Sequence, residues 1–238
     1  MRPSRTDEAV GPAQALATTA LTLARRFSAG ATMWCVAPEW PSHARHVAVE
    51  FVHPVIVGTR ALPAQSLEGP EIEQVLRLLA RPGDILLLVG SAGADTGDLL
   101  SRAEAWGLTR VWLGAGLRPA SHEADHLVWS GAHNPGLAAY SGEVVLLYHL
   151  LWELTHVVFE HPGLLTPEPA CTDEACITCS DEGRVAEVRS VFGGGLVEVI
   201  VEGKPETVDA SLVDPVGPGD LLLIHAGVAL TELAGDRP

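Results

Sequence analysis

The segment from Cys171 to Val185 separates two stretches of the chain that have different hydrophobic patterns. Before it, short apolar runs alternate with segments whose apolar residues recur at helical spacing. After it, alternating β-branched runs are separated by tight, glycine-rich turns. Strands that alternate with helices form parallel sheets covered on both faces. The sequence therefore predicts an α/β three-layer domain with a parallel sheet (the sheet domain), followed by a small all-β barrel (the barrel).

The predicted boundaries are residues 1–163 for the sheet domain, 164–175 for a proline-containing linker and 176–238 for the barrel. The sheet domain should contain five strands, at 31–37, 54–58, 84–90, 110–114 and 126–129. Its helices are expected at 7–28, 42–51, 71–80, 95–106 and 142–161. The barrel should contain four strands, at 184–191, 196–203, 206–213 and 220–230.

The net charge of −15 argues against nucleic acid or an anionic membrane surface as a partner, because both would repel the chain. The most apolar run, 144–159, is interrupted by His149, Glu153 and His156 and is too short to span a bilayer, so a buried helix is expected there. The first residues lack the pattern of a secretory signal. We therefore expect a cytoplasmic protein.

Three of the four cysteines, Cys171, Cys176 and Cys179, lie in the segment between the two domains. Thiolates are soft ligands, so this spacing favours a thiol that handles a metal or redox chemistry. Three other interpretations stay open. The thiols form an incidental disulfide, they hold a structural zinc with His161 or His225 as the fourth ligand, or the segment is an inert linker.

Histidine and glutamate residues recur at helical spacing in two predicted helices. His46 and Glu50 are four residues apart, which places them on one face of their helix. The long helix at 142–161 carries His149, and further His and Glu residues follow at intervals of three or four. One interpretation is a general acid–base pair. The other is a set of helix-face polar groups that pair with one another or with solvent.

Residues 15–163 resemble the sugar isomerase (SIS) domain, and within that group phosphoheptose isomerase. The resemblance is carried by SHARHVAVEFVHP at 42–54, RPGDILLLVG followed by a helix that ends in AWGL, and a late ADHLVW. It implies binding of a phosphosugar at the carboxyl ends of the strands. It also implies Glu50 and His149 as the catalytic pair, with His46 in the same pocket.

The two loops that would hold the phosphate depart from the pattern of that family. The loop at 37–41 reads APEWP where the family has a GNGGS-type loop, so two prolines remove amide donors and Glu39 adds a negative charge. The loop at 90–96 keeps Ser91 and Thr96 as hydroxyls that could line a ligand pocket. Phosphosugar isomerisation is therefore expected to be impaired.

Residues 176–233 resemble the HypC/HupF family of hydrogenase-maturation chaperones, through GRVAEV, EVIVEGKPETVDASLV and the closing GDLLLIHAGVA. The resemblance implies that Cys176 or Cys179 holds iron with its diatomic ligands, or a cysteine of a [NiFe]-hydrogenase large-subunit precursor. His225 would supply a second contact. The family's cysteine is amino-terminal, whereas both cysteines here are internal.

The main expectation is therefore a hydrogenase-assembly chaperone that delivers iron, with the large-subunit precursor and HypD-like maturation proteins as partners. The alternative is a sugar-phosphate isomerase or sugar-phosphate-binding protein that uses the SIS-like domain. A third possibility is a zinc- or redox-responsive regulator. The resemblance to SIS domains also implies a homodimer that pairs through helices.

Overall fold

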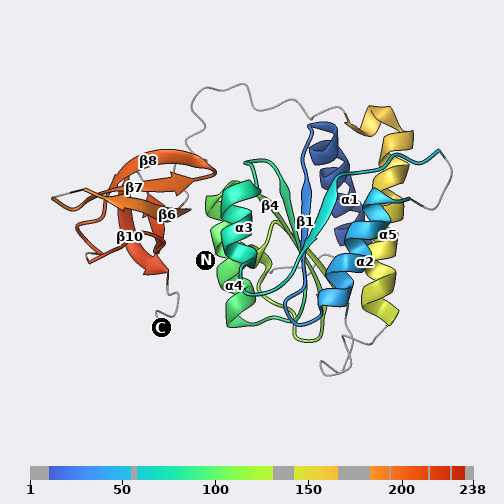
Figure 1. Cartoon of the computed structure of the whole chain (residues 1–238), viewed down its shortest axis with the longest axis horizontal. Coiled ribbons are helices and arrows are strands. Elements are labelled where there is room, and N and C mark those ends of the chain that lie inside the picture. The colour runs from blue at the N-terminus through green and yellow to red at the C-terminus, as the bar shows by residue number, and fades with distance from the viewer. Residues whose placement is uncertain are drawn as a thin grey trace, which may run out of the picture.

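The computed structural model describes residues 11–54, 58–130, 142–165, 183–192, 194–213, 215–225 and 227–233. Within these ranges the chain forms a five-stranded parallel sheet with helices, and beside it a closed five-stranded barrel (Figure 1). The predicted fold class is confirmed. Cys171, Cys176 and Cys179 lie outside the described residues, so the structure does not bear on the predictions made for these thiols.

The strands of the sheet follow the spatial order β2-β1-β3-β4-β5. Every residue of β1, β3 and β4 is buried, because these strands are apolar on both sides and lie between two layers of helices. Their bounds are β1 (Met33–Val36), β2 (Ala64–Leu67), β3 (Ile85–Val89), β4 (Thr109–Ala115) and β5 (His126–Ser130).

Successive side chains of each strand point to opposite faces and so build two separate cores. In β3, Ile85 and Leu87 pack into the first core, whereas Leu86 and Leu88 pack into the second. The first core is covered by α1 (Pro12–Ser28), α2 (Pro41–Val52) and α5 (Gly142–Glu160), and the second by α3 (Ile72–Leu79) and α4 (Ala94–Ala105). Among the described residues, this domain also contains the short 3-10 helices η1 (Ser121–Glu123) and η3 (Pro162–Leu165).

One edge strand differs from the prediction. The strand beside β1 is β2 at Ala64–Leu67, whereas the apolar run at 54–58 suggested an earlier one. Residues 55–57 of that run lie outside the described residues. Only Ala64 of β2 is buried, since an edge strand packs on one face and needs few apolar side chains.

By length and composition, α5 is apolar enough to cross a membrane. Its residues Tyr148, Leu151 and Thr155 are buried in the sheet domain, and α5 packs along α1 and against α2. This packing agrees with the buried helix expected from the sequence.

The barrel contains five strands rather than the four that the sequence suggested. The apolar run at 220–230 is two antiparallel strands, separated by a turn in which Gly227 has a φ of 81°, a conformation that favours glycine. The ring order is β10-β8-β7-β6-β9. The strands are β6 (Arg184–Val191), β7 (Leu196–Val201), β8 (Lys204–Asp209), β9 (Leu221–His225) and β10 (Val228–Leu233).

A buried carboxylate joins the barrel to the sheet domain. Glu187 of β6 is 5% exposed and forms ion pairs with Arg77 and Arg102, and Trp106 donates its indole N–H to the same carboxylate. Arg102 also donates to the carbonyl oxygen of Gly219, at 2.8 Å. The barrel therefore sits against α3 and α4, as Figure 1 shows.

We predict that Glu187→Gln lowers the free energy of unfolding by about 2 kcal/mol, because Arg77 and Arg102 lose their buried counter-charge and keep only the more exposed carboxylates of Glu73 and Asp98. Urea unfolding followed by circular dichroism measures this. The matched control is Glu206→Gln, at the half-exposed pair with Arg184 within the barrel, which should cost less than about 1 kcal/mol. Equal losses in the two variants would contradict the role given to Glu187.

We also predict that a fragment beginning near Thr172 folds alone as a β protein. The barrel is closed and has its own core of buried residues, and water would solvate Glu187 once the helices were removed. Circular dichroism and the dispersion of amide NMR signals test this. A fragment that stays unfolded would mean that the barrel depends on the sheet domain.

Candidate active site

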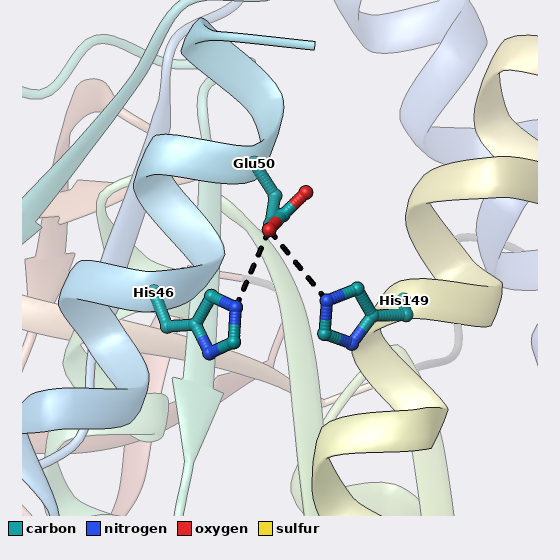
Figure 2. A group of neighbouring side chains, drawn as sticks. All are labelled: His46, Glu50 and His149. Carbon is teal, nitrogen blue, oxygen red and sulfur yellow. Dashed lines mark ion pairs between the residues drawn. The ribbon is translucent and has the colours of Figure 1, made fainter. Parts of the chain in front are cut away.

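Three polar side chains converge between α2 and α5. His46 and Glu50 come from α2 and His149 from α5, and Figure 2 shows the two imidazole rings on either side of the carboxylate. Glu50 Oε1 lies 3.3 Å from His46 Nε2 and 3.6 Å from His149 Nε2. The side chain of Glu50 is 18% exposed, whereas those of the two histidines are about 40% exposed. The group is therefore open to solvent on one side.

The fold explains why these residues meet. Pro41 begins α2 at a position where proline is favoured, and the apolar face of α2, including Val47 and Phe51, packs on the first core. The helix α5 packs on the same face of the sheet. His46 and Glu50 lie beside the buried face of α2, so they face α5.

The hydrogen bonding of His149 identifies the nitrogen that carries its proton. His149 Nδ1 lies 2.8 Å from the carbonyl oxygen of Val145, which accepts but cannot donate, so Nδ1 bears the hydrogen. Neutral His149 then presents the lone pair of Nε2 to Glu50. Two acceptors that face one another leave a place for one proton or one cation, which is the arrangement of an acid–base pair.

The same trio is a candidate metal site. One donor atom from each of His46, Glu50 and His149 lies within 4.8 Å of the other two. Two imidazoles and a carboxylate are ligands that suit Zn²⁺ and leave room for water or substrate. To bind a metal, His46 and His149 would each have to present a ring nitrogen that carries no proton.

Two neighbours of the trio were not singled out from the sequence. The hydroxyl of Tyr148 lies 2.8 Å from His46 Nδ1 and 3.4 Å from His43 Nδ1. Burial, and after it the charge of Glu50, raises the pKa of Tyr148 to about 12, so the hydroxyl keeps its proton at neutral pH. The signal for His43 was its spacing, since it lies one helical turn before His46 on the same face.

The other polar residues of α5 do not join this group. Glu153 and Glu160 are exposed. His156 is buried, with Nδ1 2.9 Å from the carbonyl oxygen of Trp152 and Nε2 3.0 Å from that of Arg60. It ties α5 to the segment before β2.

The two hydroxyls expected in the loop after β3 are engaged within the protein. Ser91, in the loop after β3, donates to Glu39 Oε2 at 3.0 Å, so it bonds a carboxylate. Thr96 is buried, donates to the carbonyl oxygen of Gly93 at 2.7 Å and accepts from the amide of Gly93 at 3.0 Å. Thr96 thus shapes the start of α4, and the charge of Glu39 opposes a phosphate beside Ser91.

His225 is the last residue of β9 and is half-buried. Its neighbour Ile224 fills the barrel core, whereas His225 is on the alternate, outer side of the strand with Leu223. His225 is therefore not a core residue. Cys35 is fully buried in β1, and burial raises the pKa of its thiol strongly.

A cavity of about 360 Å³ lies between the domains and is separate from the trio. Arg77 and Glu187 line it, so the ion pair that joins the domains borders this space. His46, Glu50 and His149 do not reach this cavity, because the helices that carry them, α2 and α5, cover the opposite face of the sheet.

No protein-family model matches the sequence, and no curated protein matches it. Solved structures do match this chain in fold. A phosphoheptose isomerase from Francisella tularensis matches with a TM-score of 0.53 and 17% sequence identity, over 63% of this chain and 88% of that protein. The sheet domain has a phosphoheptose isomerase-like fold. A phosphoheptose isomerase from Neisseria gonorrhoeae matches at a TM-score of 0.46 and 14% identity, over 59% of this chain and 84% of that protein.

Proposed function

We propose that the sheet domain interconverts an aldose and a ketose, with Glu50 as the base and His149 as the acid. The observation that carries this proposal is the approach of Glu50 Oε1 to His149 Nε2, at 3.6 Å, from two different helices. The likeness of the fold to phosphoheptose isomerase supports it. Both observations favour a catalytic role for Glu50 and His149 over a role as helix-face polar groups that only pair with one another.

The chemistry requires only proton transfers. Glu50 removes a proton from the hydroxyl-bearing carbon beside the carbonyl group, and His149 in its protonated form gives a proton to the carbonyl oxygen. The product of this step is an enediol. The enediol then returns its other hydroxyl proton to His149 and takes the proton of Glu50 at the neighbouring carbon, so both residues end in their starting states.

The environment of Ser91 narrows the substrate class. A phosphate bound at this loop would meet the carboxylate of Glu39, and the serine hydroxyl already donates to that carboxylate. Each charge-assisted contact that is missing removes about 1.5–3 kcal/mol of binding. We propose a sugar whose distal end is uncharged.

We predict that the intact protein isomerises sedoheptulose but neither binds nor isomerises sedoheptulose 7-phosphate at millimolar concentration. Isothermal titration and a chromatographic assay of both sugars measure this. Glu50→Gln should lower turnover by about 10²–10⁴-fold, whereas Glu153→Gln, on the exposed side of α5, should have no effect. Glu39→Gln should improve binding of the phosphorylated sugar.

Efficient turnover of the phosphorylated sugar by the wild-type protein would contradict the proposal of a sugar with an uncharged distal end. The proposed isomerisation would still stand. Failure to turn over either sugar would overturn the proposed reaction itself. Turnover that survives Glu50→Gln would overturn the role of Glu50.

A second candidate function, in hydrogenase assembly, rests on the sequence resemblance of residues 176–233. We propose that Cys176 or Cys179 holds iron with its diatomic ligands, or a cysteine of a large-subunit precursor, and that His225 makes a second contact. The supporting observation is that β6 begins at Arg184 opposite Ile224, so the chain enters the barrel next to His225.

We predict that Cys176→Ala abolishes hydrogenase activity in cells in which this protein is the sole one of its kind. The stability of the protein should not change, because a thiol in a linker contributes little packing. Cys179→Ala should be milder, and His225→Ala should reduce activity while the fold is retained, since His225 lies outside the barrel core. Hydrogenase assays and thermal unfolding measure the two effects.

Full hydrogenase activity in the Cys176→Ala/Cys179→Ala double variant would contradict the carrier role. A matched control is Cys35→Ala, which removes the buried thiol of β1 and should lower stability but leave the maturation chemistry intact.

A further inference from the structure

The cavity between the two domains has the size and the place of a small-molecule site. Its volume is about 360 Å³, within the range of ligand pockets, and such pockets form preferentially where domains meet. Each domain supplies part of the apolar wall. Leu76, Ala80 and Pro82 come from the sheet domain, and Ile200 and Pro218 come from the barrel. The cavity therefore exists only while the barrel is docked.

Close backbone contacts fix the shape of this cavity on one side. Gly203, in the turn between β7 and β8, donates its N–H to the carbonyl oxygen of Ala105 at 2.9 Å. Its φ is 75°, and a Cβ added there would lie 2.2 Å from the ring of Pro82. A Cβ on Gly107 would lie 2.7 Å from the carbonyl oxygen of Glu202. The turn thus packs so tightly against the sheet domain that the cavity is already formed without a ligand.

Two arginines that line the cavity keep N–H groups without an acceptor among the described residues. Arg77 contacts the carboxylates of Glu187 and Glu73 through a single nitrogen, Nη2. The contact of Arg189 is an ion pair between its Nε and Glu198 Oε2, and its length of 3.6 Å exceeds that of a hydrogen bond. A guanidinium group has five N–H donors. Both side chains can therefore donate to an anion in the cavity.

A β-bulge accounts for the position of Arg189. The pairing of β6 with β7 shifts between Val188 and Ser190, so Arg189 is the extra residue of the bulge. A bulge changes the direction of the side chain at the extra residue, and bulges are common beside functional sites. The three successive residues 187–189 line the cavity, whereas a regular strand would present only alternate side chains there. The bulge therefore adds a cation to the cavity wall.

The charge of Glu187 is balanced within the protein. Its Oε1 contacts Arg77 and Arg102, and its Oε2 accepts a hydrogen bond from the indole of Trp106. Among the described residues, the ionised side chains that line the cavity are two cations, Arg77 and Arg189, and this one anion. The wall thus has an excess of one positive charge, although the whole chain has a net charge of −15. A ligand with a single negative charge would balance that excess.

We propose that this cavity binds a small monocarboxylate with an apolar body. Arg77 and Arg189 hold the carboxylate, because guanidinium and carboxylate groups form charge-assisted hydrogen bonds in matching geometry. The apolar body lies against Leu76, Ile200 and the ring of Trp106. Since both domains contact the ligand, it binds only the docked arrangement and stabilises it. The candidate active site is on the other face of the sheet, so this proposal does not rest on the isomerase function.

The test is a titration of the full-length protein with phenylacetate as the probe, followed by calorimetry and by the indole NMR signal of Trp106. Trp106→Phe assigns that signal. We expect saturable binding at millimolar concentration and a shift of the Trp106 signal. The uncharged analogue phenylacetamide should bind about tenfold more weakly, because it lacks the charge that the arginines recognise.

Two variants place the probe in the cavity. Arg189→Gln should weaken phenylacetate binding by about tenfold. The matched control is Arg45→Gln on α2, because Arg45 is as exposed as Arg189 and also pairs with a glutamate, Glu68, but lies away from the cavity. Ala80→Leu enlarges a half-buried side chain in the wall and should abolish both the binding and the Trp106 shift. Circular dichroism checks that each variant is folded.

Absence of saturable phenylacetate binding would overturn the proposal, and so would equal affinity for phenylacetamide. Equal weakening by Arg189→Gln and Arg45→Gln would show a general charge effect and overturn the assignment of this cavity. Binding that survives in folded Ala80→Leu would overturn it as well. If Ala80→Leu does not fold, the comparison of the two arginine variants and the Trp106 signal decide the outcome.

Discussion

The burial of the central strands on both faces is the constraint on which the sheet domain depends. Every residue of β1, β3 and β4 is buried, so helices must cover both faces, and the side chains on both faces of these strands are mostly apolar. This requirement puts α2 and α5 on one face with the same core. The candidate site forms where polar residues beside the buried faces of α2 and α5 meet. Its geometry therefore follows from the way these two helices pack on the sheet.

Much of this fold could be predicted from the sequence, because strands that are buried on both faces appear in it as apolar runs. DILLLVG and RVWLG predicted β3 and β4; β3 lies within the expected range, and β4 extends one residue beyond it at each end. The edge strand β2 was missed, since Ala64–Leu67 has one buried residue and no apolar run. The strands β9 and β10 were merged, because the apolar sequence continues through the turn at Gly227.

The candidate site was predictable only in part, for a physical reason. Helical spacing puts His46 and Glu50 on one face, but no spacing rule says which other helix will lie opposite. His149 was chosen through a resemblance to a family, and Tyr148 was not chosen at all. Tyrosine in an apolar helix has the pattern of a core residue, and Tyr148 is one, yet its hydroxyl also bonds His46. Such dual roles become visible only in three dimensions.

The docking of the barrel has a consequence for how two activities could share one chain. Glu187 fixes the barrel against the helices that cover the second core, whereas Glu50 lies on the helix that covers the first. The sheet lies between Glu187 and Glu50. Under the two proposed functions, a compound released at Glu50 would have to diffuse around the molecule to reach His225. This arrangement suits independent tasks, or a partner large enough to contact both sides, better than direct channelling.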